Sequence, residues 1–511
     1  MPSTASIAHR VAVGAGWLMG WRLISRILGF ASTLTLARLL VPADFGLIAM
    51  ATSFAAVVDG LSQLRVQDAL IRNGAGDRDS WDTAFTLQAA RGLLTATVIV
   101  VATPATVAWF GEPRLAPVLL VLAGLAFLAG FENVATVEFR RTLRFGRQFV
   151  LLAVPRLAGL ATTIPLAFAW RSYWALIAGM AALRLSTLVL SYLLKPHRPR
   201  VTLAAWHGLI GFSLWAWAST IASMVWERSD ALILGGVFGP QDLGTYLLAF
   251  EIALLPITEL VAPATDALFP GFAAARAEGS DVLSSTFLVI ATLLIGVVPA
   301  ALALSASAAA LVPVILGPRW ELAAPLIAIL SPVCIFAPVS YTCGTMLMAS
   351  GYVRQHFLAM ALASVVKIGV VSLAARTQDL LLTSAVLVAC VAIESLAFLV
   401  QLRRLGRLDL RRWLPTLGRI ALAAAVTGTL AVLSGQGWKP ASPQDPTGGL
   451  LTGAALGFGT CATFWLTLAA AWWYAGRPDG AERRLVVLLA GVCSGLGRSR
   501  LLRNVSRRRP S

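Results

Sequence analysis

Long apolar stretches separated by short polar loops recur along the whole chain of 511 residues. A helix needs about 20 mainly apolar residues to cross the roughly 30 Å hydrocarbon core of a bilayer. We therefore expect an all-α polytopic membrane protein. The pattern predicts about fourteen transmembrane helices, at residues 11–36, 44–61, 82–109, 114–131, 150–169, 173–194, 208–236, 243–265, 284–314, 322–348, 356–375, 379–402, 415–434 and 449–474.

Two polar turns between these segments are near copies of each other. Residues 42–46 read Pro-Ala-Asp-Phe-Gly and residues 240–244 read Pro-Gln-Asp-Leu-Gly. A second pair, at 111–117 and 317–325, recurs at nearly the same offset. Six predicted helices separate the copies, so both halves have the same orientation, with a pseudo-twofold axis along the membrane normal and a cavity between the halves. The predicted organisation is two six-helix lobes at 1–200 and 201–402, an extra helix pair at 403–475 and a basic cytoplasmic tail at 476–511.

Composition and charge support a membrane protein and indicate its orientation. The chain is 58% hydrophobic and 13% charged, and its net charge is +17. Short positively charged loops stay in the cytoplasm, and loops on the N-terminal side carry seventeen Lys and Arg residues against six on the other side. We expect both termini in the cytoplasm. Because the basic residues are scattered over short loops, we expect no nucleic-acid partner.

The sequence carries no pattern of an enzyme or a metal site. None of its three lysines lies in a Gly-x-x-x-x-Gly-Lys-Ser/Thr loop, so it offers no phosphate-binding loop for ATP. The five cysteines lack the close Cys/His spacing of a metal site. The longest outer loop, at 435–448, is too short for a catalytic domain. We expect no enzymatic activity, no cofactor and no metal.

Charged residues inside the predicted spans are the main functional signal. Each costs about 2.5–3.5 kcal/mol if it faces lipid, so these residues are expected to face protein or a wet cavity. Arg22 and Arg26 lie one turn apart on one helical face, and the forks of two guanidiniums there favour an anion site. The alternative is that the charges pair across helices, for example Arg228 with Asp230 or Glu227.

An ordered series of short motifs resembles the Wzx-type polysaccharide flippases, in the branch that contains colanic-acid and teichuronic-acid exporters. The resemblance begins at residues 36–47, Leu-Ala-Arg-Leu-Leu-Val-Pro-Ala-Asp-Phe-Gly-Leu, and covers about 400 residues in order. The further motifs lie at 68–71, 138–145, 173–176, 198–200, 230–235, 243–246, 255–256 and 268–270. The resemblance implies the fold of the multidrug/oligosaccharidyl-lipid/polysaccharide exporter superfamily.

The resemblance also implies a cargo and a mechanism. The expected cargo is an undecaprenyl-diphosphate-linked oligosaccharide, moved by alternating access for exopolysaccharide or lipopolysaccharide synthesis. The expected partners are membrane lipids, a polysaccharide polymerase and a chain-length regulator. The charged residues inside the predicted spans supply the expected site residues for this cargo. The expected diphosphate-binding residues are Arg22, Arg26, Arg91, Arg156, Arg184 and Arg228. The candidates for coupling transport to an ion are Asp59, Glu227, Asp230, Glu251 and Glu394.

Three alternatives to this function stay open on the sequence. A lipid II flippase and a multidrug or cation antiporter belong to the same superfamily, and a non-transporting scaffold of a polysaccharide synthase complex is a different class. The antiporter requires an acidic cavity, whereas arginines outnumber acids in the spans of the first lobe. Five tryptophans are expected either to stack on sugar rings or to anchor helices at the membrane interface: Trp17, Trp21, Trp215, Trp217 and Trp226.

Overall fold

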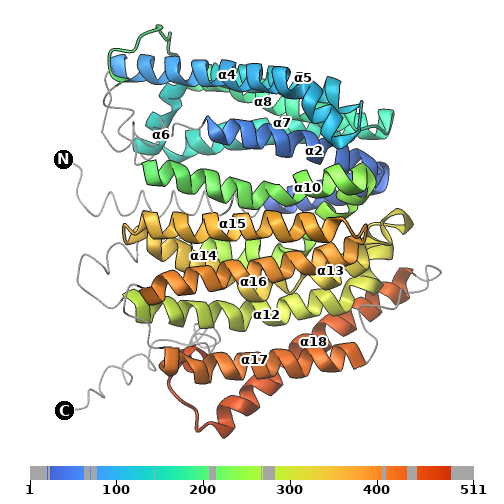
Figure 1. Ribbon diagram of the computed structural model, residues 1–511. Helices are drawn as coiled ribbons and strands as arrows, with labels where there is room; N and C mark the ends of the chain where they lie inside the picture. The colour runs from blue at the N-terminus through green and yellow to red at the C-terminus, as the bar shows by residue number, and fades with distance from the viewer. Residues whose placement is uncertain are drawn as a thin grey trace, which may run out of the picture. The chain divides into compact units, whose positions relative to one another are not determined.

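The computed structural model is built from α-helices, and its described residues contain no strand (Figure 1). The described residues are 20, 24–62, 70, 78–142, 144–206, 214–265, 268, 282–404, 410–433 and 446–484. The expectation of an all-α polytopic membrane protein is confirmed.

The helices follow most of the predicted apolar segments. The exception is α10 (Leu214–Ala253), which covers parts of two predicted spans, 208–236 and 243–265, and has a non-helical break between them at Gly239, with φ 79°. The first described helix covers residues 24–39. The elements after it are α2 (Pro42–Leu61), α4 (Arg78–Phe110), α5 (Leu115–Gly130), η1 (Val134–Thr136), α6 (Val137–Arg141), α7 (Phe145–Trp170), α8 (Trp174–Leu194), α10 (Leu214–Ala253), η2 (Ile257–Val261), α12 (Val282–Ile315), η3 (Pro318–Trp320), α13 (Ala323–Leu330), α14 (Val333–Ala349), α15 (Val353–Ala375), α16 (Leu380–Arg404), α17 (Leu410–Leu433) and α18 (Pro446–Tyr474).

Nine helices of the described chain are long and apolar enough to cross a membrane, and the number is eleven if two bent pairs count as one span each. One bent pair joins α10 to the helical turns after it at 44°, and the other joins α13 to α14 at 48°. The predicted span 114–131 corresponds to the shorter helix α5, of 16 residues. Residues 11–19 and 21–23 of the first predicted span lie outside the described residues. The count of fourteen therefore stays a prediction.

The chain folds as two compact units. Unit 1 comprises residues 1–249, 312–323 and 360–387, and unit 2 comprises 250–311, 324–359 and 388–511. In unit 1, Leu36 and Leu40 form a buried cluster with two alanines of α7 and α8. In unit 2, side chains from η2, α12 and α14 form another buried cluster. The predicted boundaries between lobes, extra helices and tail stay a prediction.

The two Pro-x-Asp-x-Gly copies, expected as turns, are helical: one begins α2 and the other follows the break at Gly239 in α10. They contact each other inside unit 1. A Cβ added to Gly46 would lie 1.7 Å from the carbonyl oxygen of Pro240, and a Cβ added to Gly244 would lie 1.9 Å from that of Pro42. Each glycine thus lies against the proline carbonyl of the other copy. This reciprocal contact is the arrangement that a local twofold axis produces.

The second pair of copies also has a glycine with positive φ in common. Gly111, after α4, and Gly317, after α12, have φ values of 62° and 96°. Glycine adopts positive φ at little cost, so it suits a position within two residues of each helix end. Beyond the second turn, the Trp320 indole Nε1–H donates to the carbonyl of Ala37 at 2.8 Å. The repeated motifs therefore mark equivalent helix ends.

Candidate functional site

A cavity of about 610 Å³ lies among the helices of unit 1. Its walls come from α2, α4, α5 and α8 and from the turn that follows α5. Most of the lining is apolar, with two threonines and one glutamine, while four charged side chains project into it: Asp59, Arg91, Glu132 and Arg184. A mostly apolar hollow of this size with a few polar groups is typical of a small-molecule site.

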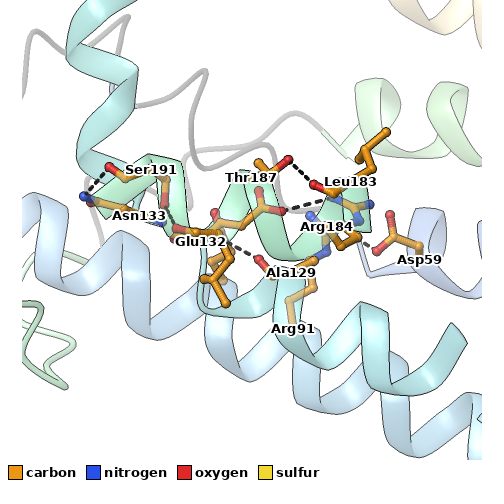
Figure 2. A network of polar contacts seen from close by, with 11 residues as sticks. Asp59, Arg91, Ala129, Glu132, Asn133, Leu183, Arg184, Thr187 and Ser191 are labelled. Carbon is orange, nitrogen blue, oxygen red and sulfur yellow. Dashed lines mark hydrogen bonds and ion pairs between the residues drawn. The ribbon is translucent and has the colours of Figure 1, made fainter. Parts of the chain in front are cut away.

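The four charges form two ion pairs between helices, drawn in Figure 2. Arg91 Nη2, on α4, lies 2.5 Å from Asp59 Oδ1, on α2. Arg184 Nη1, on α8, lies 3.1 Å from Glu132 Oε1. These four side chains are between 24% and 46% exposed, because they border the cavity and are not covered by other side chains. Each pair has one nitrogen–oxygen contact, so further donors and acceptors face the hollow.

Glu132 is held in place by the helices on both sides of its turn. The Gln88 side-chain amide, on α4, donates to the carbonyls of Ala129 at 3.2 Å and Glu132 at 3.0 Å. The hydroxyl of Tyr192, on α8, donates to the carbonyl of Phe131 at 2.9 Å. The Ala129 carbonyl also accepts from the Glu132 backbone N–H at 3.3 Å, so backbone and side-chain hydrogen bonds together close this turn. The turn is thereby fixed with the Glu132 side chain beside Arg184.

Two glycines bring α4 and α5 close together beside the cavity. A Cβ added to Gly92 would lie 2.7 Å from the Cα of Gly130, so no larger residue fits at this crossing without a shift of the backbone. Small residues allow membrane helices to approach in this way. Arg91 precedes Gly92, so the crossing places its side chain near the turn that carries Glu132.

Two predicted diphosphate residues outside the cavity lie on adjacent elements, the helix at residues 24–39 and α7. Arg26 is exposed on the helix at residues 24–39. A Cβ added to Gly29, one turn further along, would lie 3.1 Å from Nη2 of Arg156 on α7. The Arg156 guanidinium therefore lies against the helix that carries Arg26. Arg22 lies outside the described residues.

Asp230, predicted as an ion-coupling residue, is buried in a polar cluster instead of lining the cavity. Its Oδ2 accepts a hydrogen bond from the Tyr246 hydroxyl at 2.9 Å and lies 3.7 Å from the ammonium of Lys367, on α15. The ammonium donates to the carbonyl of Trp226 at 2.6 Å and lies 4.6 Å from the centre of the Trp226 ring. The counter-charge of Asp230 is therefore Lys367, and the partner considered from the sequence, Arg228, is half-buried elsewhere on α10.

The remaining predicted ion-coupling residues do not line the cavity and lie apart from one another in the sequence. Glu227 and Glu251 are exposed on α10, and Glu394 is buried on α16 in unit 2. Of the expected tryptophans, Trp17 and Trp21 lie outside the described residues. Trp215, Trp217 and Trp226 do not line the cavity, and the Trp226 ring faces Lys367. The sequence thus singled out Asp59, Arg91 and Arg184, which the structure brings together.

Sequence reasoning missed Glu132 and gave Lys367 no role. Glu132 follows the predicted span 114–131 by one residue, so the sequence pattern places it in a loop. Lys367 lies within the predicted span 356–375, where the sequence pattern indicates no partner for it. The available signal for Glu132 was an unpaired arginine, Arg184, in the middle of a neighbouring span.

Comparison with known proteins supports the same family that the motifs indicated. Residues 35–325 match the family described as "Polysaccharide biosynthesis protein". The lipopolysaccharide biosynthesis protein WzxC of Escherichia coli (strain K12) is 24% identical over 359 residues, which is 69% of this chain and 72% of WzxC. The succinoglycan biosynthesis transport protein ExoT of Rhizobium meliloti (strain 1021) is 25% identical over 325 residues, which is 61% of this chain and 65% of ExoT. The resemblance to Wzx-type flippases is confirmed.

Solved structures show the same fold. The lipid II flippase MurJ, in an inward closed conformation, has a TM-score of 0.68 at 12% identity over 88% of this chain and 98% of its own. An inward-facing multidrug resistance transporter of the MATE family has a TM-score of 0.56 at 16% identity over 78% of this chain and 95% of its own. With a family match over more than half of its length and this fold, the chain is a multi-pass membrane protein that belongs to the polysaccharide biosynthesis protein family.

Proposed function

We propose that this protein is a flippase that moves undecaprenyl-diphosphate-linked oligosaccharides across the bacterial inner membrane by alternating access. The product serves exopolysaccharide or lipopolysaccharide synthesis. The observation that carries the proposal is the charged cavity of unit 1, on helices of a family whose relatives are named for polysaccharide biosynthesis and transport.

The chemistry of the cargo explains why a carrier of this kind needs charges within the membrane. A diphosphate or a sugar hydroxyl without a partner costs kilocalories in hydrocarbon. Guanidiniums meet phosphate oxygens with a fixed fork of donors. We assign the diphosphate to Arg26, on the helix at residues 24–39, and to Arg156, whose guanidinium lies against that helix at Gly29, together with Arg22 and Arg228 from the sequence. Arg156 has no carboxylate partner within the described part of the chain, so its charge is open to an anion.

The remaining features of the proposal concern drive, orientation and partners. We propose that an ion gradient or the membrane potential drives transport. Asp59 is the first candidate for the ion-coupling residue, because it borders the cavity. The termini are placed in the cytoplasm from the loop charges. The protein binds and releases its cargo without making or breaking bonds. It works beside a polysaccharide polymerase and a chain-length regulator, which take up the flipped units.

The test is a flipping assay with the purified full-length protein in proteoliposomes. The lipid-linked oligosaccharide is taken from a strain that lacks the gene, in which it should accumulate on the cytoplasmic side. We expect the protein to expose this lipid to a membrane-impermeant sugar-modifying reagent and to act poorly on lipid II. Arg156→Gln should lower the rate by about tenfold or more, because it removes a charge-assisted hydrogen bond to phosphate worth about 1.5–3 kcal/mol.

Three results would contradict the proposal. The first is no accumulated lipid-linked oligosaccharide in the deletion strain. The second is lipid II as the preferred cargo, and the third is a protein that leaves both lipids on their original side.

Arg114→Gln is the matched control, because Arg114 lies in the loop between α4 and α5 and pairs with Glu112 away from the cavity. Its variant should flip the cargo at the normal rate.

A further inference from the structure

We propose that the cavity bordered by Asp59, Arg91, Glu132 and Arg184 is the site for the sugar residues of the cargo, and that the diphosphate binds elsewhere. The inference deepens the proposed function and rests on it. It changes the assignment of two arginines, Arg91 and Arg184, which the sequence grouped with the diphosphate ligands. The reasons are the charge balance of the cavity and the hydrogen-bonding groups that its ion pairs leave open.

The cavity has no net charge to offer an anion. Two guanidiniums face it, each with its own carboxylate at 2.5 Å or 3.1 Å, and no further charged residue of the described chain lines it. An arriving diphosphate would have to displace Asp59 or Glu132 from its arginine. It would then lie beside an uncompensated carboxylate of its own sign, and separating a partly buried pair in this way is costly.

A neutral sugar can bind in this cavity without separating either ion pair. A carboxylate accepts at about four positions and a guanidinium donates about five hydrogens, whereas each pair here uses one contact. A hydroxyl both donates and accepts, so one hydroxyl can donate to a free carboxylate oxygen while the next accepts from a free guanidinium N–H. Two such pairs in one hollow therefore bind neighbouring hydroxyls while both ion pairs stay intact.

The size and the remaining lining fit the same ligand class. About 610 Å³ falls within the roughly 300–1,000 Å³ that small-molecule sites occupy. Thr52 and Thr95 add hydroxyls to the wall, and the alanines and leucines around them suit the C–H faces of a sugar ring. The turn that carries Glu132 is held by hydrogen bonds from α4 and α8, so this acceptor is preorganised.

The experiment separates sugar binding from diphosphate binding in the full-length purified protein. The probes are the oligosaccharide released from its lipid by mild acid, and inorganic diphosphate, each titrated by calorimetry. We expect Asp59→Asn and Glu132→Gln to weaken oligosaccharide binding by about 10- to 100-fold, the loss of one hydrogen bond to a charged group. The affinity for inorganic diphosphate should not fall in these variants. Arg156→Gln should show the opposite pattern.

A matched control and a competition test complete the design. Glu112→Gln removes a carboxylate that also pairs with an arginine but lies outside the cavity, so its oligosaccharide affinity should equal that of the unchanged protein. Saturating diphosphate should leave the oligosaccharide bound, since the two sites differ. The inference is overturned if the unchanged protein fails to bind the oligosaccharide, or if diphosphate displaces it. It is also overturned if Arg91→Gln and Arg184→Gln abolish diphosphate binding.

These outcomes are distinct from failure of the proposed function. If the unchanged protein and the Glu132→Gln variant flip the lipid-linked oligosaccharide equally well, the flippase function is supported and the proposed sugar site is contradicted. If the unchanged protein flips no lipid-linked oligosaccharide, the proposed function itself fails.

Discussion

Two groups of intramembrane charges in unit 1 differ in what surrounds them. The pairs Asp59–Arg91 and Glu132–Arg184 border a cavity and are 24–46% exposed, and each has a single contact. Asp230 and Lys367 are 5–7% exposed at their side chains. They are enclosed by a tyrosine hydroxyl, a backbone carbonyl and an indole ring. The first group keeps free donors and acceptors, whereas the second has most of its bonding capacity filled by the protein.

The difference shows why a charge within a span is an ambiguous sign of function. Every such charge needs a partner to be tolerated in the membrane. A partner that fills all its bonds gives structure, whereas a partner that leaves bonds open beside a hollow gives a binding site. We therefore interpret Asp230–Lys367 as a structural pair between α10 and α15, and the cavity pairs as ligand-binding groups.

The largest expected effect is on stability, at the enclosed pair. Asp230→Ala or Lys367→Ala leaves one buried charge without its partner and should lower the free energy of unfolding by about 3–5 kcal/mol. The double variant Asp230→Asn/Lys367→Met removes both charges and should recover most of this loss. Thermal unfolding of the detergent-solubilised protein measures both. If the single variants are as stable as the unchanged protein, the Asp230–Lys367 pair is not a structural pair and resembles the cavity pairs in its small contribution to stability.

A smaller loss is expected at the glycine crossing beside the cavity. Gly92→Ala places a methyl group against the backbone of Gly130 and should cost about 1–3 kcal/mol of stability through overpacking. It should also weaken oligosaccharide binding, because it shifts Arg91 away from the turn of Glu132. The matched control is Gly124→Ala on α5, where no atom lies within 4 Å of the added Cβ. Equal effects of the two substitutions would show that the close crossing does not shape the cavity.

The cavity pairs themselves should contribute little to stability. Glu132→Gln should change the free energy of unfolding by about 1 kcal/mol or less, because the pair is partly exposed and water screens it. Oligosaccharide affinity should fall in the same variant. This combination, a small thermal shift with a large loss of binding, is the reverse of that expected for Lys367→Ala. A large thermal shift would indicate that Glu132 mainly holds α5 to α8.

The smallest effect concerns a loop pair outside the membrane spans. Hydrogen bonds from the Arg114 side chain and backbone hold the pKa of Glu112 below its ordinary value of 4.5. A lowered pKa stabilises the fold fully above pH 4.5, and the contribution disappears as the pH falls through the lowered value. Glu112→Gln should therefore cost less than about 1 kcal/mol near neutral pH. The difference from the unchanged protein should vanish in acid, as followed by thermal unfolding against pH, and a difference that grew in acid would contradict this assignment.

Much of the fold and part of the site were predictable from the sequence. The length of the apolar segments predicted the helices, because a bilayer requires that length, and the repeated turns predicted equivalent helix ends. The cost of charge in a membrane singled out Asp59, Arg91, Arg184 and Asp230 as residues with partners.

Only the tertiary structure decided which partners these residues have. Asp230 meets Lys367, 137 positions away, and Arg184 meets Glu132 from a turn that lies outside every predicted span. No local pattern encodes these contacts, because they depend on how helices cross, as at Gly92 and Gly130. The sequence by itself determined that charges enter the membrane and must be compensated. The packing of the helices determined which charges are enclosed and which border a cavity, since the space left around a side chain depends on every helix that surrounds it.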